Sequence, residues 1–402
     1  RMAGPLGDRV DPDPGVPMGT RCDRIVSEAF LMLSSSPVRV LIVDDSQVFR
    51  RFLARALSAD PKIQVIGEAV SAEEAREFLK CNQPDVITLD LEMPGKGGLV
   101  FLRDEITRLK IPTVVISSRT QRGAKITIEA LTAGAVDVLP KPRGLTPGTP
   151  DHAALANIAL RLKTAARARV HRAKEHVLSA PSAPAPNNAD DWVIVLGAST
   201  GGVQALGVVL QAMPLGCPPI VIVQHMPEGF TEAFARRLDQ TCQISVREAE
   251  DGDQLRMGQA LIAPGGQRHM KLAQTASGKH YVALVPGEPV CFSIPSVDVL
   301  FASAARVASP RLSGAVLTGM GSDGAEGLAA MRQAGAQTFV QDRESSVIFG
   351  MPARAWEKGA AMEMVPIDRM AERLLASIGT SSANLATSGA ADARNTQKGL
   401  GS

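Results

Sequence analysis

The stretch WVIVLGASTGG, residues 192–202, leads from a run of apolar residues directly into a turn of small residues. The run from Trp192 to Leu196 has the length of a buried strand and is far too short to span a membrane. From Val203 onward the pattern favours a helix, so the stretch predicts a strand, a tight turn and a helix. Ser199 lies at the centre of G-A-S-T-G, whose glycines let the chain bend closely beneath its hydroxyl.

This turn has two physical interpretations. A G-x-S-x-G motif between a strand and a helix is typical of a nucleophilic serine. Small residues before a helix are equally typical of a phosphate-binding turn, in which Ser199 would cap the helix. The motif alone does not distinguish the two, so the residues at neighbouring strand ends matter.

A nucleophilic serine needs a base, and VIVQH ends a second predicted strand with His225. Parallel strands end at one edge of a sheet, so this histidine is expected at the same edge as Ser199. His269, in PGGQRHM, follows a loop and is the rival base. The remaining histidines lie in a connector or a polar stretch: His152, His171, His176 and His280.

The base in turn needs an orienting carboxylate. The predicted strand GAVLT runs into the loop G-M-G-S-D-G, which places Asp323 just before a predicted helix over residues 325–334. An aspartate there is also a common helix N-cap, and both roles are compatible. The chain order Ser, His, Asp differs from the Ser, Asp, His order of the α/β-hydrolases.

A second group of polar residues ends strands in the N-terminal half. VRVLIV runs into Asp44 and Asp45, and DVITL runs into Asp90. Each aspartate alone is explained as a turn or cap residue, but three at one edge would repel one another unless a cation lay among them. All-oxygen ligation suits Mg²⁺. Ser117 and Lys141 end the next two predicted strands and supply a hydroxyl and an ammonium suited to a phosphoryl group.

Strand, loop and helix alternate in both halves of the chain, so we predict two α/β domains. The first is a five-stranded parallel, flavodoxin-like domain, and the second is a doubly wound, mostly parallel α/β hydrolytic domain. The predicted division is a leader at 1–36, the first domain at 38–142, a linker containing a helix at 143–190, the second domain at 191–378 and a tail at 379–402. We expect the leader and tail to be disordered.

Composition excludes several classes of protein. Lys and Arg number 43 against 41 Asp and Glu, and aromatic residues make up 3% of the 402 residues, which disfavours a nucleic-acid binder. No helix-turn-helix pattern follows the first domain. No apolar run approaches a membrane span, so no direct membrane insertion is expected. The 5 cysteines are scattered and form no C-x-x-C pair, which predicts reduced thiols and a cytoplasmic location.

The order Asp44-Asp45, Asp90, Ser117, Lys141 resembles the receiver domain of two-component response regulators. The resemblance implies that Asp90 accepts a phosphoryl group from a histidine kinase. It implies that the three aspartates hold Mg²⁺, and that Ser117 and Lys141 read the phosphorylated state. One position departs from the common pattern. Val138 stands three residues before the lysine, where many receivers carry an aromatic switch residue.

The second domain resembles the catalytic domain of the chemotaxis protein-glutamate methylesterases, the CheB family. The resemblance rests on the motifs GASTGG, QHMP, APGGQRHM, GMGSDG and QDRESSVIFGMP. Because the receiver ahead of this domain has the same arrangement as in that family, the resemblance extends over about residues 38–376. It implies hydrolysis of glutamate γ-methyl esters, and deamidation of glutamines, on methyl-accepting chemoreceptors. It further implies that Ser199 is the nucleophile, His225 the base and Asp323 its orienting acid, with backbone amides near Thr200 and Met320 binding the oxyanion. No metal or other cofactor is expected in this domain.

A receiver joined to a hydrolase suggests control by occlusion, in which the unphosphorylated receiver covers the serine. The alternative is a receiver linked to an α/β module that binds phosphate or protein and has no hydrolase activity.

Overall fold

The computed structural model describes residues 36–94, 97–117, 120–142, 152–170 and 191–378. The predicted leader before residue 36, the predicted tail and parts of the predicted linker lie outside these ranges. Among the described helices, none combines the length and the apolar character needed to cross a bilayer.

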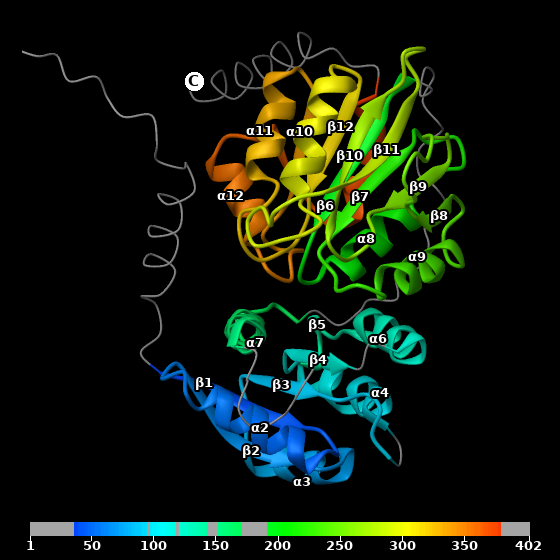
Figure 1. The fold of residues 1–402 in the computed structure, drawn as a ribbon. Helices are drawn as coiled ribbons and strands as arrows, with labels where there is room; N and C mark the ends of the chain where they lie inside the picture. The colour runs from blue at the N-terminus through cyan, green and yellow to red at the C-terminus, as the bar shows by residue number, and fades with distance from the viewer. Residues whose placement is uncertain (1–35, 95–96, 118–119, 143–151, 171–190, 379–402) are drawn as a thin grey trace, which may run out of the picture. The chain divides into compact units, whose positions relative to one another are not determined.

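The first domain is built on a five-stranded parallel sheet in the order β2-β1-β3-β4-β5 (Figure 1). Its strands are β1 (Val38–Val43), β2 (Ile63–Ala69), β3 (Val86–Leu89), β4 (Thr113–Ser117) and β5 (Asp137–Pro140). Every neighbouring pair is parallel, which confirms the predicted fold. The carboxyl ends of β1 and β3 are adjacent, so the residues that follow them meet at one edge.

Three helices of this domain start at hydroxyl caps in loops that follow strands. Side-chain oxygens of Ser46, Ser71 and Thr120 accept backbone N–H groups three residues on, at the first turns of α2, α3 and α6. The helices are α2 (Gln47–Leu57), α3 (Ala72–Cys81), α4 (Gly97–Phe101), α5 (Thr107–Leu109) and α6 (Gln121–Ala133), with a π-helical turn at Leu102–Ile106. The predicted linker helix is α7 (His152–Ala165).

The second domain contains a seven-stranded sheet in the order β14-β13-β12-β6-β7-β9-β8. All of its strand pairs are parallel. The strands are β6 (Val193–Ala198), β7 (Ile220–Gln224), β8 (Ser245–Glu248), β9 (Gln259–Ile262), β12 (Leu312–Val316), β13 (Gln337–Gln341) and β14 (Glu363–Val365).

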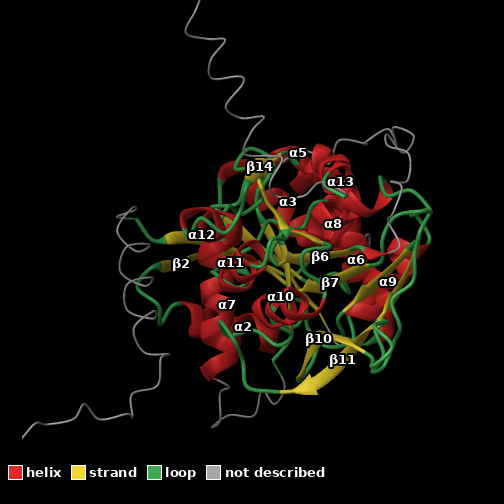
Figure 2. Ribbon diagram, turned by 90° about the horizontal axis from the view of Figure 1, so that it is seen from above, coloured by secondary structure: helices red, strands yellow, loops and turns green. Residues whose placement is uncertain are grey.

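Helices cover both faces of this sheet (Figures 1 and 2). Alternate residues of β6 are buried on opposite faces of the sheet. Ile194 and Leu196 belong to the same hydrophobic cluster as Leu206 of α8. Val195 belongs to another cluster, with Leu300 of α10. The helices are α8 (Gly202–Gln211), α9 (Thr231–Asp239), α10 (Val297–Val307), α11 (Ala325–Gln333), α12 (Met351–Glu357) and α13 (Ile367–Ala376). The doubly wound prediction is confirmed.

One element was not predicted. Strands β10 (Arg268–Gln274) and β11 (His280–Pro286) form a separate antiparallel pair. Fewer than half of the residues in each of these strands are buried, so the apolar signal of the pair is weaker than that of the central strands. The segment after β11 leads to α10, whose first residues reach the predicted catalytic edge.

Candidate active site

Three adjacent strands carry the predicted catalytic residues. β6 lies between β12 and β7, and Ser199 and His225 directly follow β6 and β7. Asp323 lies in the loop between β12 and α11. Because all three strands are parallel, the residues that follow them lie at one edge of the sheet, as predicted.

The turn at Ser199 depends on close backbone packing. The Ser199 N–H donates to the Thr318 carbonyl at 3.0 Å, and the Gly202 N–H donates to the Ser199 carbonyl at 2.8 Å. Gly201 has φ +79°, and a Cβ there would lie 2.6 Å from Cβ of Val347. Only glycine satisfies both conditions, so this residue allows the chain to turn beneath the serine.

His225 and Asp323 are hydrogen-bonded at the edge of the sheet. The distance between His225 Nε2 and Asp323 Oδ2 is 2.8 Å, and both side chains are buried. Asp323 also accepts from the Ser296 hydroxyl at 2.8 Å, from the Val297 N–H at 2.7 Å and from the Asp298 N–H at 2.9 Å. The N-terminal end of α10 therefore holds the carboxylate in place against the histidine.

Two neighbouring carboxylates in this group, Asp323 and Asp298, have pKa values that are shifted in opposite directions. Burial opposes ionisation of Asp323, but the hydrogen bonds from His225 and from the backbone of Val297 and Asp298 outweigh it and hold its pKa below the ordinary value. Burial and the nearby Asp323 charge raise the pKa of Asp298 to about 7. Asp323 is thus the ionised partner suited to an imidazolium.

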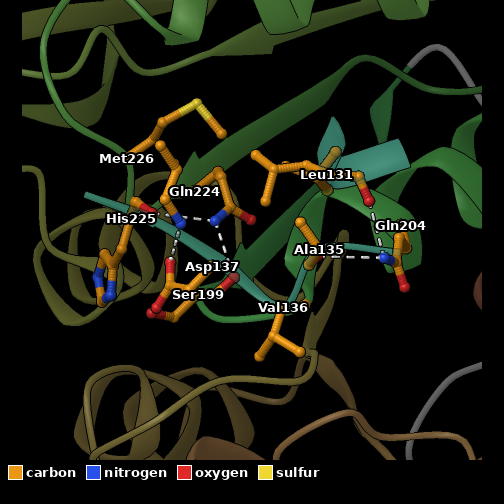
Figure 3. Close-up of a pocket in the computed structure, with 12 residues that line it drawn as sticks. Leu131, Ala135, Val136, Asp137, Ser199, Gln204, Gln224, His225 and Met226 are labelled. Atoms are coloured by element: carbon orange, nitrogen blue, oxygen red, sulfur yellow. Dashed lines mark hydrogen bonds between the residues drawn. The ribbon is translucent and has the colours of Figure 1, made fainter. Parts of the chain in front are cut away.

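Ser199 and His225 line one small pocket (Figure 3). In the described part of the chain, the Ser199 hydroxyl makes no hydrogen bond to the His225 ring. The His225 Nδ1 atom instead lies 3.5 Å from the Ser293 hydroxyl. Catalytic hydrogen bonds are often long before substrate binds, so transfer of a proton between Ser199 and His225 stays a prediction.

The two predicted oxyanion residues follow the carboxyl ends of two adjacent strands, β6 and β12. Thr200 follows Ser199, and Met320 lies in the loop that follows β12. Among the hydrogen bonds of the described residues, neither backbone N–H has an acceptor. The Thr200 hydroxyl donates to Asp137 Oδ2 at 2.8 Å, so its side chain is engaged while its amide is available.

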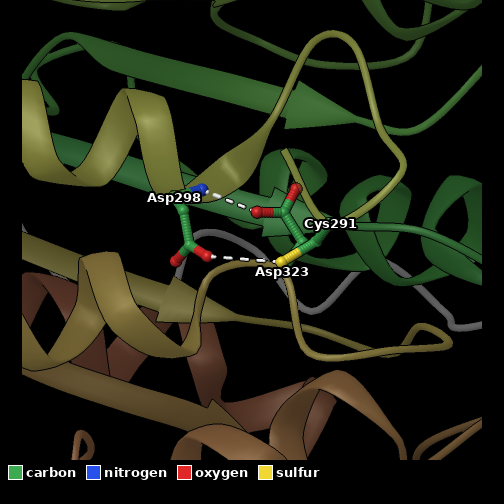
Figure 4. A group of neighbouring side chains, drawn as sticks. All are labelled: Cys291, Asp298 and Asp323. Carbon is green, nitrogen blue, oxygen red and sulfur yellow. Dashed lines mark hydrogen bonds between the residues drawn. The ribbon is translucent and has the colours of Figure 1, made fainter. Parts of the chain in front are cut away.

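Cys291, Asp298 and Asp323 form a group of three potential metal ligands (Figure 4). Both oxygens of Asp323 already accept two hydrogen bonds each, from His225, Ser296 and the backbone of Val297 and Asp298. These bonds use the lone pairs that a cation would need. The group therefore serves as a hydrogen-bonded support for His225.

The rival base His269 has a structural position. It lies in β10 and is 3% exposed. One ring nitrogen lies 2.9 Å from the Glu288 carbonyl, and the other accepts the Ser296 N–H at 3.1 Å. Both nitrogens are occupied by the backbone, so His269 fixes the segment before α10 and is not placed to act as a base.

Sequence reasoning missed Ser296 and Asp298, which hold Asp323. A signal was present, because Ser296 directly precedes the apolar run VDVLF and is typical of a helix N-cap. The Ser296 hydroxyl accepts the Val299 N–H at 3.4 Å as well as donating to Asp323.

The receiver residues also meet at one sheet edge. Oxygens of Asp44, Asp45 and Asp90 lie within 4.8 Å of one another. Lys141 Nζ lies 2.8 Å from Asp44 Oδ2 and 2.6 Å from Asp90 Oδ2. Ser117, at the end of β4, is buried, and its carbonyl accepts the Lys141 N–H at 2.9 Å. The side chains of the three aspartates and Lys141 therefore form one group, and Ser117 adjoins Lys141 through the backbone.

The charges of these receiver residues favour the binding of a cation. Burial is the largest influence on Asp44 and raises its pKa, against the opposing effect of Lys141. Burial lowers the pKa of Lys141, but its hydrogen bonds to Asp44 and Asp90 outweigh burial and raise it overall. The carboxylate oxygens are clustered, and among the described residues Asp44 Oδ2 is stabilised only by Lys141. This arrangement matches the donor set that Mg²⁺ prefers.

The fold and the two sites define a response-regulator receiver followed by a parallel α/β domain with a histidine–aspartate pair beside a serine turn. Comparison with known families agrees. The response regulator receiver domain profile matches residues 40–146, and the CheB methylesterase profile matches residues 194–374. The chain belongs to the CheB methylesterase family, which confirms the resemblance inferred from the motifs.

Similar proteins cover most of the chain. A protein-glutamate methylesterase/protein-glutamine glutaminase of a group 2 operon in Cereibacter sphaeroides is 50% identical over 84% of this chain and 91% of that protein. Protein-glutamate methylesterase/protein-glutamine glutaminase 1 from Xanthomonas campestris pv. campestris is 47% identical over 86% of this chain and 98% of that protein. The crystal structure of the Thermotoga maritima CheB methylesterase catalytic domain is 36% identical, with a TM-score of 0.45, over 46% of this chain and 98% of that chain.

Proposed function

We propose that this chain is a phosphorylation-controlled protein-glutamate methylesterase that hydrolyses glutamate γ-methyl esters on methyl-accepting chemoreceptors and deamidates glutamines there. Family membership and the names of the relatives support the class of reaction. The hydrogen bond between His225 and Asp323, at the sheet edge that carries Ser199, is the observation on which the proposal rests.

The proposed reaction is acyl transfer. With Nε2 of His225 donating to Asp323, Nδ1 is the nitrogen that accepts the Ser199 proton as the hydroxyl oxygen attacks the ester carbonyl. The imidazolium then protonates the departing methoxide, which leaves as methanol. Water, deprotonated by the same nitrogen, attacks the acyl-enzyme and releases the glutamate carboxylate and the serine. Deamidation follows the same steps with ammonia as the leaving group.

The tetrahedral intermediate needs hydrogen-bond donors for its oxyanion. The Thr200 and Met320 amides are proposed for this role because Thr200 directly follows Ser199, Met320 lies in the loop after the adjacent strand β12, and neither amide has an acceptor among the described hydrogen bonds. One oxyanion donor is commonly worth about 3 kcal/mol of transition-state stabilisation.

Receiver control is proposed to act by covering this pocket. Val136 and Asp137 of the receiver line it together with Ser199, and Ser199 is 3% exposed. The Gly201 N–H donates to the Val136 carbonyl at 3.1 Å, directly behind the serine. The residue in place of an aromatic switch, Val138, lines the same pocket. Its position suggests that packing of β5 against the serine turn carries the signal.

The linker helix also contacts both proposed oxyanion residues. Arg161 Nη1 lies 3.1 Å from the Thr200 hydroxyl, and the Thr164 hydroxyl lies 2.8 Å from the Met320 sulfur. Helix α7 therefore takes part in the closed arrangement that phosphorylation is proposed to open.

In the receiver, Asp90 is the proposed phosphoryl acceptor and a histidine kinase the proposed donor. Asp44, Asp45 and Asp90 would hold Mg²⁺, which supplies positive charge to the phosphoryl oxygens when bound. Lys141 and Ser117 would contact the phosphoryl group. We further propose a cytoplasmic location, where both the kinase and the receptor signalling segments are available, with no role in binding nucleic acid.

Methanol release from methylated receptor membranes tests the function. Wild type should release methanol, and Ser199→Ala should lower the rate by about a thousandfold or more while its unfolding transition stays that of a folded chain. Retained signalling output without methanol release by wild type would instead favour the α/β binding module.

A further inference from the structure

The segment that leads into α10 contains a tight turn at Cys291 and Phe292. Val290 and Ser293 exchange two backbone hydrogen bonds, of 3.2 and 2.9 Å. Cys291 has φ 49° and Phe292 has φ 62°. Two-residue turns with positive φ at both central positions strongly prefer Asn, Asp and Gly. Cysteine and phenylalanine are unfavourable there, so neither residue is explained by backbone geometry.

The solvent exposure of the Phe292 side chain is also unfavourable for the stability of the fold. The side chain is 90% exposed, more than any other large apolar side chain in the described part of the chain. A single exposed apolar residue is ordinary on a protein surface. An exposed phenylalanine at a strained position is different, because a glycine or asparagine there would be better for stability on both counts.

The turn is located beside the catalytic residues. The Ser293 hydroxyl, one residue after Phe292, lies 3.5 Å from Nδ1 of His225. The Cys291 sulfur, one residue before, lies 3.8 Å from the Ser322 hydroxyl and 3.9 Å from Asp298 Oδ2. Both neighbours of Phe292 thus contact the surroundings of the His225–Asp323 pair, so the turn that carries the exposed ring lies beside this pair.

We propose that Phe292 contacts the protein substrate next to the esterified glutamate and contributes to selection of receptors over small esters. This inference rests on the proposed function. A glutamate side chain is short, so its ester carbonyl reaches Ser199 only if the substrate backbone lies against the rim of the pocket. The methyl ester is uncharged, which makes an apolar ring a suitable neighbour. A phenyl ring supplies a large contact area with few rotatable bonds.

The test compares two substrates of the same full-length, phosphodonor-treated enzyme: methylated receptor in membranes and a small soluble glutamate γ-methyl ester. The measured quantity is the selectivity ratio, kcat/KM for receptor divided by kcat/KM for the small ester. Phe292→Gly should lower this ratio about tenfold through KM for receptor, the size of effect expected for a contacting aromatic. Its melting temperature should equal or exceed that of wild type, because glycine relieves the positive φ.

Two further variants complete the design. Phe292→Tyr keeps the ring and should restore a selectivity ratio close to that of wild type. Leu215→Ala removes another apolar side chain, 68% exposed, in the loop before β7 at the opposite sheet edge, and should leave the ratio unchanged.

The outcomes separate this inference from the proposed function. An unchanged ratio in Phe292→Gly, or an equal loss on both substrates, would overturn the contact role while leaving the esterase intact. Absence of methanol from both substrates with wild type would refute the proposed function itself.

Discussion

Two neighbouring carboxylates at the active site differ in their ionisation. Asp323 is held ionised by His225 and by backbone N–H groups, whereas burial and the Asp323 charge raise the pKa of Asp298 from 3.8 to about 7. Between these two pH values the folded chain keeps a proton on Asp298 that the unfolded chain releases. The contribution of Asp298 to stability is therefore fully present below pH 3.8 and is lost as the pH rises through about 7.

Asp298→Asn tests this assignment. Asparagine can still accept the Gly327 N–H, which lies 2.7 Å from Asp298 Oδ1, but it does not titrate. We expect the free energy of unfolding of the variant, relative to wild type, to increase between about pH 4 and about pH 7, the interval between the unfolded and folded pKa values of Asp298. Urea unfolding at each pH measures it. A difference that is the same across this range would show that Asp298 stays ionised in the folded state.

For individual residues, the sequence was sufficient to predict those whose position follows from the order of the strands. Ser199, His225 and Asp323 each follow a strand of one parallel sheet, so their shared edge could be inferred without coordinates. Ser296 and Asp298 could not be found in this way, since their contacts with Asp323 require α10 to meet a loop more than twenty residues away. The absence of a Ser199–His225 hydrogen bond was equally beyond pattern reasoning.

The turn between β6 and α8 has no room for added volume at Gly201. We expect Gly201→Ala to lower the free energy of unfolding by about 1–3 kcal/mol or more, because it adds strain at positive φ and a clash with Val347. Gly207→Ala is the matched control: it lies inside α8, and apart from its chain neighbours and the backbone of its own helix no described atom lies within 4 Å of its added Cβ. Alanine there should stabilise the helix by about 0.5–1 kcal/mol. Equal effects of the two substitutions would contradict the described turn.

Helix α7 connects the receiver to the serine turn through one side chain. Arg161 Nη1 lies 2.8 Å from Asp137 Oδ2 and 3.1 Å from the Thr200 hydroxyl. Arg161→Ala should raise methanol release by the unphosphorylated chain about tenfold, since a charge-assisted hydrogen bond that holds the closed state is lost.

Lys163→Ala provides the control for this helix. Lys163 pairs with Asp60 within the receiver side of the chain, so its loss should leave the unphosphorylated rate near that of wild type. If both variants raised the rate alike, the effect would come from α7 as a whole and not from the Arg161 contact. The sequence predicted a helix in the linker, but its contacts could not be derived because the basic residues of that stretch also fit a solvated surface.

For the whole molecule, alternation of strands and helices was sufficient to predict two α/β domains and their sheet type. It was insufficient for the contacts between them. Gln204 of α8 donates to the Leu131 carbonyl of α6 at 2.8 Å, and nothing in either local pattern marks these residues as partners. Contacts of this kind depend on surface complementarity, which a periodic pattern does not encode. The antiparallel β10–β11 pair was missed for the related reason that its strands are only half buried.

The most direct test of the account is the rate of methanol release from methylated receptor membranes by the full-length chain, with and without a small phosphodonor and Mg²⁺. The account predicts that the phosphodonor raises the rate for wild type and has no effect on Asp90→Asn. Only wild type can be phosphorylated at Asp90, which is proposed to uncover Ser199. Equal rates with and without phosphodonor for wild type, or the same increase in Asp90→Asn, would contradict it.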